Sequence, residues 1–270
     1  MAKAPKKAST RVTSEPANER QCKCGGRGWY VVTEIISHED HEYEVSRSKV
    51  CICQKIAKAK ANEIPPEFKG KTFKDLRIYR KGWNKDDPGD LGNALAVAVA
   101  KEFVDNFEEH KKNRTGPFFF GKPGRGKSLL CSIIFQELCK KGHYPVYLHF
   151  RQFLDKLIES YKNEDTFSEN DYYNVISEAD VVIIDELRTI KTSRESQWQQ
   201  DKIYKIVEAA KLIVVDSNFE LSWIEKNIGD YVASRINRFC GLPVYVGGPD
   251  QRAIIGKQLQ DEYLKRVVGE

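Results

Sequence analysis

The residues Gly121-Lys-Pro-Gly-Arg-Gly-Lys127-Ser128 decide the fold of this chain. They follow the apolar run Pro117-Phe-Phe-Phe120 and precede the apolar run Leu129-Leu-Cys-Ser-Ile-Ile134. This order predicts a buried strand, a glycine-rich loop and the start of a helix, and the loop fits the Walker A spacing without a mismatch. A chance glycine-rich turn in front of a helix is the alternative interpretation.

Phosphate binding explains why these residue types occur in this order. Glycines allow successive backbone N–H groups to point at phosphates, and the helix N-terminus adds a partial positive charge. Lys127 would reach the terminal phosphates, and Ser128 would offer its hydroxyl to Mg²⁺. We therefore expect ATP to be bound by a loop that consists of Gly121, Lys122, Pro123, Gly124, Arg125, Gly126, Lys127 and Ser128.

Length and composition limit the class of protein. The 270 residues allow one full domain and a small accessory module. Hydrophobic residues make up 40% and charged residues 31%, as in soluble globular proteins, and no apolar run in the sequence is long enough to cross a membrane. The N-terminal residues have no apolar core for a signal peptide, so we expect a cytoplasmic protein without a membrane partner. The net charge of +5 permits nucleic-acid binding without proving it.

Composition divides the chain into three segments. Residues 1–20 are rich in Ala, Lys, Ser, Thr and Pro and are expected to form a disordered leader. Residues 21–63 hold two cysteine pairs around two strand-like runs, Trp29–Ile36 and a second that ends near Val50, which predicts a β-hairpin module. Residues 64–270 alternate strand-like with helical runs, which predicts an α/β domain with a parallel sheet flanked by helices on both faces.

Apolar periodicity gives the expected elements of the α/β domain. A long helix is expected over residues 90–112, because apolar residues recur at helical spacing at Leu91, Leu95, Val99, Phe103 and Phe107. Strands are expected at residues 118–120, 146–150, 181–184 and 212–215. Further helices are expected at residues 129–141, 153–161 and 202–210.

Two carboxylates follow the apolar strand Val181–Ile184. Because ligands bind at the carboxyl ends of parallel strands, we expect Asp185 and Glu186 beside Ser128. Asp185 fits the role of the Walker B aspartate that organises Mg²⁺, and Glu186 is placed to orient or deprotonate the attacking water. The ordinary start of an exposed loop is the alternative for two acids at this place.

Polar residues farther along the chain are candidates for the same site. Asn218 follows an apolar strand and could hydrogen-bond the γ-phosphate or the attacking water, although Asn at this place is also common in turns. Arg235 and Arg252 could stabilise charge on a transferred phosphoryl group, in the same subunit or a neighbouring one. Arginines on a solvated helix are the alternative, above all for Arg238.

The order of these motifs resembles that of the AAA+ ATPases of the DnaC and DnaI type, the bacterial and phage replicative helicase loaders, with the transposition helper IstB as a relative. The motifs that carry the resemblance are Gly121–Ser128, Asp180–Leu187, Val215–Asn218, Val232–Phe239 and Asp250–Arg252. The resemblance implies an ATPase that loads a replicative hexameric helicase onto single-stranded DNA during replication initiation. It also implies the sensor 1 role for Asn218, the sensor 2 position for Arg252, and an arginine finger at Arg235 that acts on a neighbouring copy's nucleotide.

Two positions depart from the family pattern. The pair Asp185-Glu186 replaces the two aspartates of many members, which leaves the metal role intact and favours a competent hydrolytic carboxylate. Tyr231 stands where the family often has another arginine four residues before the finger, so the second arginine of a two-arginine contact is absent at this position.

The segments Cys22-Lys-Cys24 and Cys51-Ile-Cys53 lie at the two ends of the expected hairpin. Four thiolates satisfy the tetrahedral coordination of Zn²⁺, so we expect a zinc-binding module. The first pair is tighter by one residue than the usual knuckle, which leaves free thiols as the alternative. His38 and His41 would lie at the far tip of the hairpin. In the family this module contacts the helicase, while the ATPase domain grips single-stranded DNA.

Basic residues and an aromatic ring follow the second motif at Lys191, Arg194, Trp198 and Lys202. They are candidate contacts for single-stranded DNA, because aromatic rings stack on bases and cations track phosphates; a solvated helix is the alternative. Two further functions are consistent with the same residues. One is a transposition helper ATPase like IstB, and the other is a nucleotide-gated DNA-binding adaptor with negligible turnover.

Overall fold

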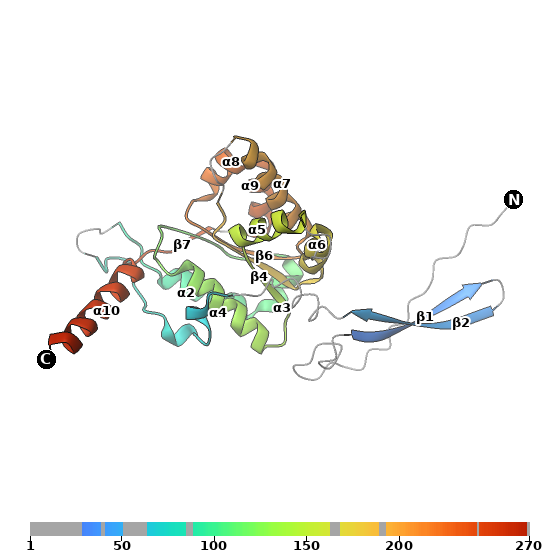
Figure 1. Cartoon of the computed structure of the whole chain (residues 1–270), viewed down its shortest axis with the longest axis horizontal. Helices are drawn as coiled ribbons and strands as arrows, with labels where there is room; N and C mark the ends of the chain where they lie inside the picture. Colours follow the sequence, from blue (N-terminus) through green and yellow to red (C-terminus); the bar gives the residue numbers. More distant parts are fainter. Residues whose placement is uncertain are drawn as a thin grey trace.

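The computed structural model describes residues 29–38, 41–50, 64–84, 89–162, 168–188, 193–241 and 243–268. A two-stranded hairpin and an α/β domain lie within these ranges (Figure 1). The leader expected over residues 1–20 and the cysteines expected to bind zinc, Cys22, Cys24, Cys51 and Cys53, lie outside them.

Strands β1 (Trp29–His38) and β2 (His41–Val50) form the predicted antiparallel hairpin. Trp29 pairs with Val50 at one end and His38 with His41 at the other, so the two histidines lie at the tip, as expected. A pair of strands buries little apolar surface. Trp29 is accordingly 46% exposed and Val31 55% exposed.

A five-stranded sheet is the centre of the α/β domain. All of its pairings are parallel, and the strand order is β4-β5-β6-β3-β7. The strands are β3 (Phe118–Phe120), β4 (Pro145–His149), β5 (Val181–Asp185), β6 (Ile213–Ser217) and β7 (Pro243–Tyr245). The parallel sheet predicted from the alternation of runs is therefore confirmed.

Helices cover both faces of the sheet (Figure 1). One layer consists of α2 (Ala94–Asp105), α3 (Phe107–Asn113) and α4 (Lys127–Lys140). The other layer consists of α5 (Phe150–Ser160), α6 (Glu169–Glu178), α7 (Ser193–Ala209), α8 (Leu221–Ile228) and α9 (Asp230–Phe239). Two short 3₁₀ turns, η1 (Pro66–Phe68) and η2 (Phe73–Asp75), precede α2, and α10 (Gln251–Val268) follows β7.

Alternation along β5 divides its side chains between two hydrophobic cores. Val182 and Ile184 pack with the layer that contains α5 to α9. Val181 and Ile183 pack with the layer that contains α2 and α4. All four side chains are completely buried, as a central parallel strand requires. The same alternation turns the next residue, Asp185, toward α4.

The prediction of one helix over residues 90–112 is wrong in its bounds. It is also wrong about which apolar residues are buried, because the first two of the series are exposed. The helix begins at Ala94, and Asn106 separates α2 from α3. Leu91 and Leu95 are 52% and 63% exposed, whereas Phe103 and Phe107 are buried. In an α-helix, each step of four residues rotates about 40° beyond a full turn. Residues spaced only by four therefore wind around the helix and do not all lie on its buried face.

Other differences concern the ends of elements and the last third of the chain. Strands β4 and β6 lie within one or two residues of their predicted positions, and α7 begins nine residues earlier than predicted. The elements β7, α6, α8 and α10 were not predicted, because each has a short or weak apolar pattern. Within the described residues, none of the helices is long and apolar enough to span a bilayer.

Candidate functional site

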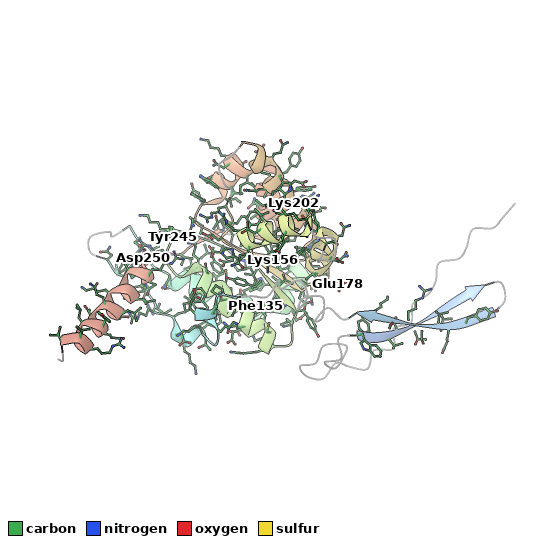
Figure 2. All side chains as sticks on the ribbon, viewed as in Figure 1. Phe135, Lys156, Glu178, Lys202, Tyr245 and Asp250 are labelled. Carbon is green, nitrogen blue, oxygen red and sulfur yellow. The ribbon has the colours of Figure 1, made fainter. Side chains whose placement is uncertain are left out.

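The loop between β3 and α4 has a backbone that favours glycine, most clearly at Gly124 and Gly126. Gly124 has φ +76° and Gly126 has φ +89°, conformations that L side chains rarely adopt. A Cβ at Gly124 would also lie 2.0 Å from Oδ1 of Asp250, a residue at the start of α10 (Figure 2). Lys127 begins α4, and no side chain of the described residues caps its first turn. The N–H groups of this turn can therefore be offered to an anion.

Lys127 is held above the loop by three acceptors. Its side chain is buried, and Nζ donates to the carbonyl oxygens of Gly121 at 2.9 Å and Lys122 at 3.1 Å. The third hydrogen bond, of 2.8 Å, goes to Oδ1 of Asn218, so the phosphate loop and the end of β6 meet at this amine. Burial lowers the pKa of the Lys127 ammonium, while the carboxylate of Asp216 opposes this effect.

A carboxylate at the end of β6 accepts the hydroxyl hydrogen of the loop serine. Ser128 Oγ donates to Oδ2 of Asp216 at 3.0 Å, and Asp216 is only 2% exposed. Burial raises the pKa of Asp216 well above its ordinary value, and the neighbouring Asp185 carboxylate raises it further. Asp216 is thus a buried acid at the centre of the site.

Asp185 lies beside Asp216. One of its carboxylate oxygens accepts a hydrogen bond, and the other does not. Tyr147, on β4, donates a hydrogen bond of 2.6 Å to Oδ2 of Asp185. The other oxygen, Oδ1, is buried and has no hydrogen-bond partner among the residues that the structure describes. A buried carboxylate oxygen without a donor is a costly arrangement unless a cation completes it. Asp185 and Ser128 therefore fit the ligands of Mg²⁺.

The hydrogen bond from Tyr147 gives a testable contribution to stability. We expect Tyr147→Phe to lower the free energy of unfolding by about 1–3 kcal/mol, because it leaves both oxygens of a buried carboxylate without a protein donor. Urea denaturation of the ligand-free protein measures the loss. Tyr263→Phe on α10, where the side chain is 61% exposed, is the matched control and should change little. A Tyr147→Phe protein as stable as the wild type would contradict this role of the hydroxyl.

Glu186 follows Asp185 in a strained conformation. Its φ is +58°, in the left-handed region. This conformation costs a non-glycine residue about 1–3 kcal/mol, and residues strained in this way are concentrated at functional sites. His149 Nε2 lies 3.4 Å from Oε2 and Arg188 lies 3.6 Å from Oε1 of this carboxylate. The side chain is 33% exposed, so it remains accessible to water.

Two adjoining cavities contain the candidate nucleotide-binding residues. A cavity of about 330 Å³ is lined by Asp185, Glu186, Asp216, Asn218 and Arg252, together with the loop residues Pro123, Gly124, Gly126, Lys127 and Ser128. A second cavity, of about 370 Å³, has a mixed lining. Apolar residues that include Val97, Leu130, Val246 and Ile254 line it together with the charged residues Glu67, Lys71, Asp75, Arg77 and Arg125. Gly126, Leu129, Gln251 and Ile255 line both. The first cavity, which contains the loop and the carboxylates, suits phosphates, and the apolar residues of the second suit a base.

The two arginines are placed differently. Arg252 lies in the first turn of α10 and lines the cavity that contains the loop and the carboxylates. Arg235 lies on α9, where its guanidinium is 2.5 Å from Oε2 of Glu208 and 3.2 Å from the hydroxyl of Tyr204, both on α7. The sequence predicts that Arg235 acts on a neighbouring copy, but in the structure its side chain contacts residues of its own chain.

The structure contradicts one of the expected DNA contacts. Lys202 (labelled in Figure 2) is buried on α7, and its Nζ lies 2.7 Å from Oε1 of Glu169. A buried, paired lysine cannot track a phosphate backbone, so this prediction is wrong. Trp198 packs against the hydrophobic core, and Lys191 and the side chain of Arg194 lie outside what the structure describes.

Sequence reasoning missed Tyr147, His149 and Asp216 as site residues. Their positions depend on strand order, since His149 pairs with Asp185 across β4 and β5, and Tyr147 is two residues earlier on β4. Only for Asp216 was a signal present, because it ends an apolar strand in the same way as Asp185. In the described part of the chain, no group of three or more His, Cys, Asp and Glu side chains could hold a metal ion.

Comparison with known proteins gives a family match. The family described as the bacterial DnaA ATPase domain matches residues 89–243, more than half of the chain. Among curated proteins, the replicative helicase loader DnaC of Escherichia coli (strain K12) is 29% identical over 117 residues, which cover 43% of this chain and 45% of that protein. The chain thus spans less than half the length of this relative.

Solved structures share the fold. The crystal structure of DnaI superposes with a TM-score of 0.53 at 19% identity, covering 72% of this chain and 98% of that one. The crystal structure of the DnaC helicase loader superposes with a TM-score of 0.53 at 17% identity, covering 67% of this chain and 99% of that one. At these identities the likeness shows a common α/β architecture.

Proposed function

This chain belongs to the family of the bacterial DnaA ATPase domain, and on that premise we propose that it is an ATPase that loads a replicative hexameric helicase onto single-stranded DNA. The observation that carries the ATPase proposal is the cavity in which the phosphate loop, Asp185, Glu186 and Asn218 meet. The loading proposal is supported by the similarity to a protein named replicative helicase loader. Such a protein would work in the cytoplasm.

The residues of the cavity suggest how ATP would be bound. The amine of Lys127 would exchange its two loop carbonyl acceptors for phosphate oxygens, while Asn218 would hold the γ-phosphate or the attacking water. Ser128 and Asp185 would hold Mg²⁺, which neutralises phosphate charge when it is bound. Arg252 would add positive charge from α10, and the second cavity would receive the base against apolar residues such as Val97 and Leu130.

Hydrolysis would depend on Glu186. A carboxylate at this place can take a proton from a water molecule that attacks the γ-phosphate. His149 and Arg188 lie on either side of it and would restrict its orientation, because each is within 4 Å of one carboxylate oxygen. We further propose that single-stranded DNA or the helicase stimulates this step, and that Arg235 contributes to it from a neighbouring copy.

The hairpin is the proposed contact with the helicase, with Zn²⁺ held by Cys22, Cys24, Cys51 and Cys53. Support for this proposal comes from the hairpin register: Trp29 pairs with Val50, and Cys51 follows Val50 directly in the sequence. Four thiolates are a suitable donor set for structural zinc. The apolar side chains that β1 exposes would contribute to the contact.

Removing two thiolates tests both the zinc site and the helicase contact. We expect the double variant Cys51→Ser, Cys53→Ser to lose about one equivalent of zinc, because two ligands do not hold a structural ion. It should also lose co-purification with the replicative helicase of the same host or phage, yet bind ATP as the wild type does. Cys139→Ser, which changes an exposed cysteine on α4, is the control and should affect neither.

Each result of this experiment bears on a different part of the proposal. Wild-type protein without zinc would contradict the metal site alone. Wild-type protein that binds no helicase from its host or phage would contradict the loader function and leave the ATPase intact. Zinc content would be measured by elemental analysis, and helicase binding by pull-down with the full chain.

A nucleotide-gated adaptor with negligible turnover is the second candidate function. The observation that favours it is the ion pair between Arg235 and Glu208, which keeps the proposed finger within its own chain. Turnover measured with and without single-stranded DNA separates the two functions. A loader of the proposed kind hydrolyses ATP faster with DNA, whereas a pure switch shows no stimulated turnover.

A further inference from the structure

Strands β5 and β6 place a second carboxylate, that of Asp216, beside Asp185 at the candidate metal site. They are parallel neighbours, and their pairing runs up to Ile184 opposite Val215. The next residue on each strand is an aspartate, so Asp185 and Asp216 lie side by side at the carboxyl ends of adjacent strands, with Ser217 the last residue of β6. Both are 2% exposed, and alternation turns both toward α4, because Ile183 and Val214 pack in the core that contains this helix.

The hydroxyl of Ser128 distinguishes the two acids. A serine hydroxyl has one hydrogen to donate and two lone pairs with which to accept. The hydrogen goes to Oδ2 of Asp216, at 3.0 Å. The lone pairs of Ser128 Oγ are then directed away from Asp216 and remain for a cation. Asp185 accepts its hydrogen bond from Tyr147 instead.

The nearby lysine does not neutralise these acids by direct hydrogen bonds. An ammonium group has three donors, and Lys127 uses them for Gly121, Lys122 and Asn218. Two buried carboxylates in contact repel one another, and burial removes the water that would screen them. A divalent cation beside Ser128 would supply the missing charge, and Oδ1 of Asp185 is the buried oxygen that has no donor.

We propose that Asp216 is a second carboxylate of the Mg²⁺ site, which positions the hydroxyl of Ser128 and adds negative charge for the cation. This inference rests on the proposed function, because it requires that the site binds a nucleotide with Mg²⁺. It goes beyond the pair of Ser128 and Asp185 that the motifs indicate. Asp216 acts on the metal partly through Ser128 and is in that respect a positioning residue.

Opposite effects on two affinities distinguish this role from a structural one. Asp216→Asn keeps the shape of the side chain and removes its charge. In EDTA, we expect it to bind a fluorescent non-hydrolysable ATP analogue as tightly as the wild type or more tightly, because asparagine places no negative charge near the phosphates. With the analogue present, we expect its affinity for Mn²⁺, measured from the EPR signal of the free ion, to fall about 10-fold or more. Damage to the fold would weaken both.

A control variant and a double-mutant cycle complete the test. Asp105→Asn, on the exposed end of α2, should change neither affinity. Combining Asp216→Asn with Ser128→Ala should weaken Mn²⁺ binding by less than the two single losses together, because the two residues act as a pair. If thermal melting shows that Asp216→Asn is unfolded, Asp216→Ser takes its place in the same measurements.

The outcomes separate this inference from the proposed function. A wild-type protein that binds no ATP analogue contradicts the proposed function. A wild-type protein that binds the analogue more tightly with Mn²⁺, together with an Asp216→Asn protein of the same Mn²⁺ affinity, overturns the role of Asp216 alone. Equal losses in EDTA and in Mn²⁺ also overturn it, because they indicate a structural role.

Discussion

Glu186→Gln is expected to lower the ATP turnover number by about 100-fold or more, since general bases contribute factors of this size. Glutamine has nearly the shape of glutamate but cannot take a proton from water. The affinity for ATP should stay within about twofold, because the phosphates are held by the loop and by Lys127. Turnover is measured by phosphate release at saturating ATP, and affinity is measured with a fluorescent ATP analogue.

The strained backbone of Glu186 makes the glutamine variant the right probe. The residue adopts φ +58° in the wild-type chain, and glutamine pays the same conformational cost, so stability should change little. Glu137→Gln on α4, where the side chain pairs with Lys140 at the surface, is the matched control and should retain turnover. Full turnover in the Glu186→Gln protein would remove this carboxylate from the hydrolytic step.

The centre of the fold could be predicted because its signals are local. The loop Gly121–Ser128 needs glycines, a lysine and a helix start within eight residues, and strand β5 is a short apolar run that ends in acids. Both features depend on neighbouring residues alone. The structure places them together in one cavity, as the carboxyl ends of parallel strands require.

The parts that could not be predicted depend on contacts between distant segments. Whether Asp216 and Tyr147 face Asp185 depends on the order β4-β5-β6, which periodicity does not reveal. Lys202 appeared to be a surface cation in the sequence, but α6 covers it and supplies Glu169 as a partner. Element ends were shifted for a similar reason, since packing and capping rather than apolar spacing decide where a helix stops.

Arg235 presents the sharpest conflict between sequence and structure. The family resemblance assigns it to a neighbouring copy's nucleotide, yet it pairs with Glu208 and lies over the ring of Tyr204 at 5.0 Å from its centroid. The arginine and glutamate side chains are 33% and 52% exposed. Ion pairs with this exposure contribute about 0–1 kcal/mol. An arginine finger contributes a factor of about 10³ or more, equivalent to about 4 kcal/mol, so the pair with Glu208 would not prevent the exchange.

Mixing two inactive variants tests whether Arg235 acts on a neighbour. Arg235→Ala should lower DNA-stimulated turnover by about 10³-fold, and Lys127→Ala should abolish ATP binding at its own site. In an equal mixture, about a quarter of the interfaces would join an intact loop to an intact arginine, so about a quarter of wild-type turnover should return. Arg238→Ala, one turn farther along α9, is the control for each measurement.

The same mixture also distinguishes a purely structural role of Arg235 from a role at a neighbouring copy's nucleotide. If Arg235 only joins α9 to α7, Arg235→Ala lowers stability, Glu208→Gln does the same, and the mixture stays inactive because neither protein can repair the other. If Arg235 reaches a neighbouring nucleotide, Glu208→Gln keeps or increases turnover, because it releases the arginine while leaving it charged. The activity of the mixture and the sign of the Glu208→Gln effect together decide between an arginine that belongs to its own chain and one that completes the site of the next.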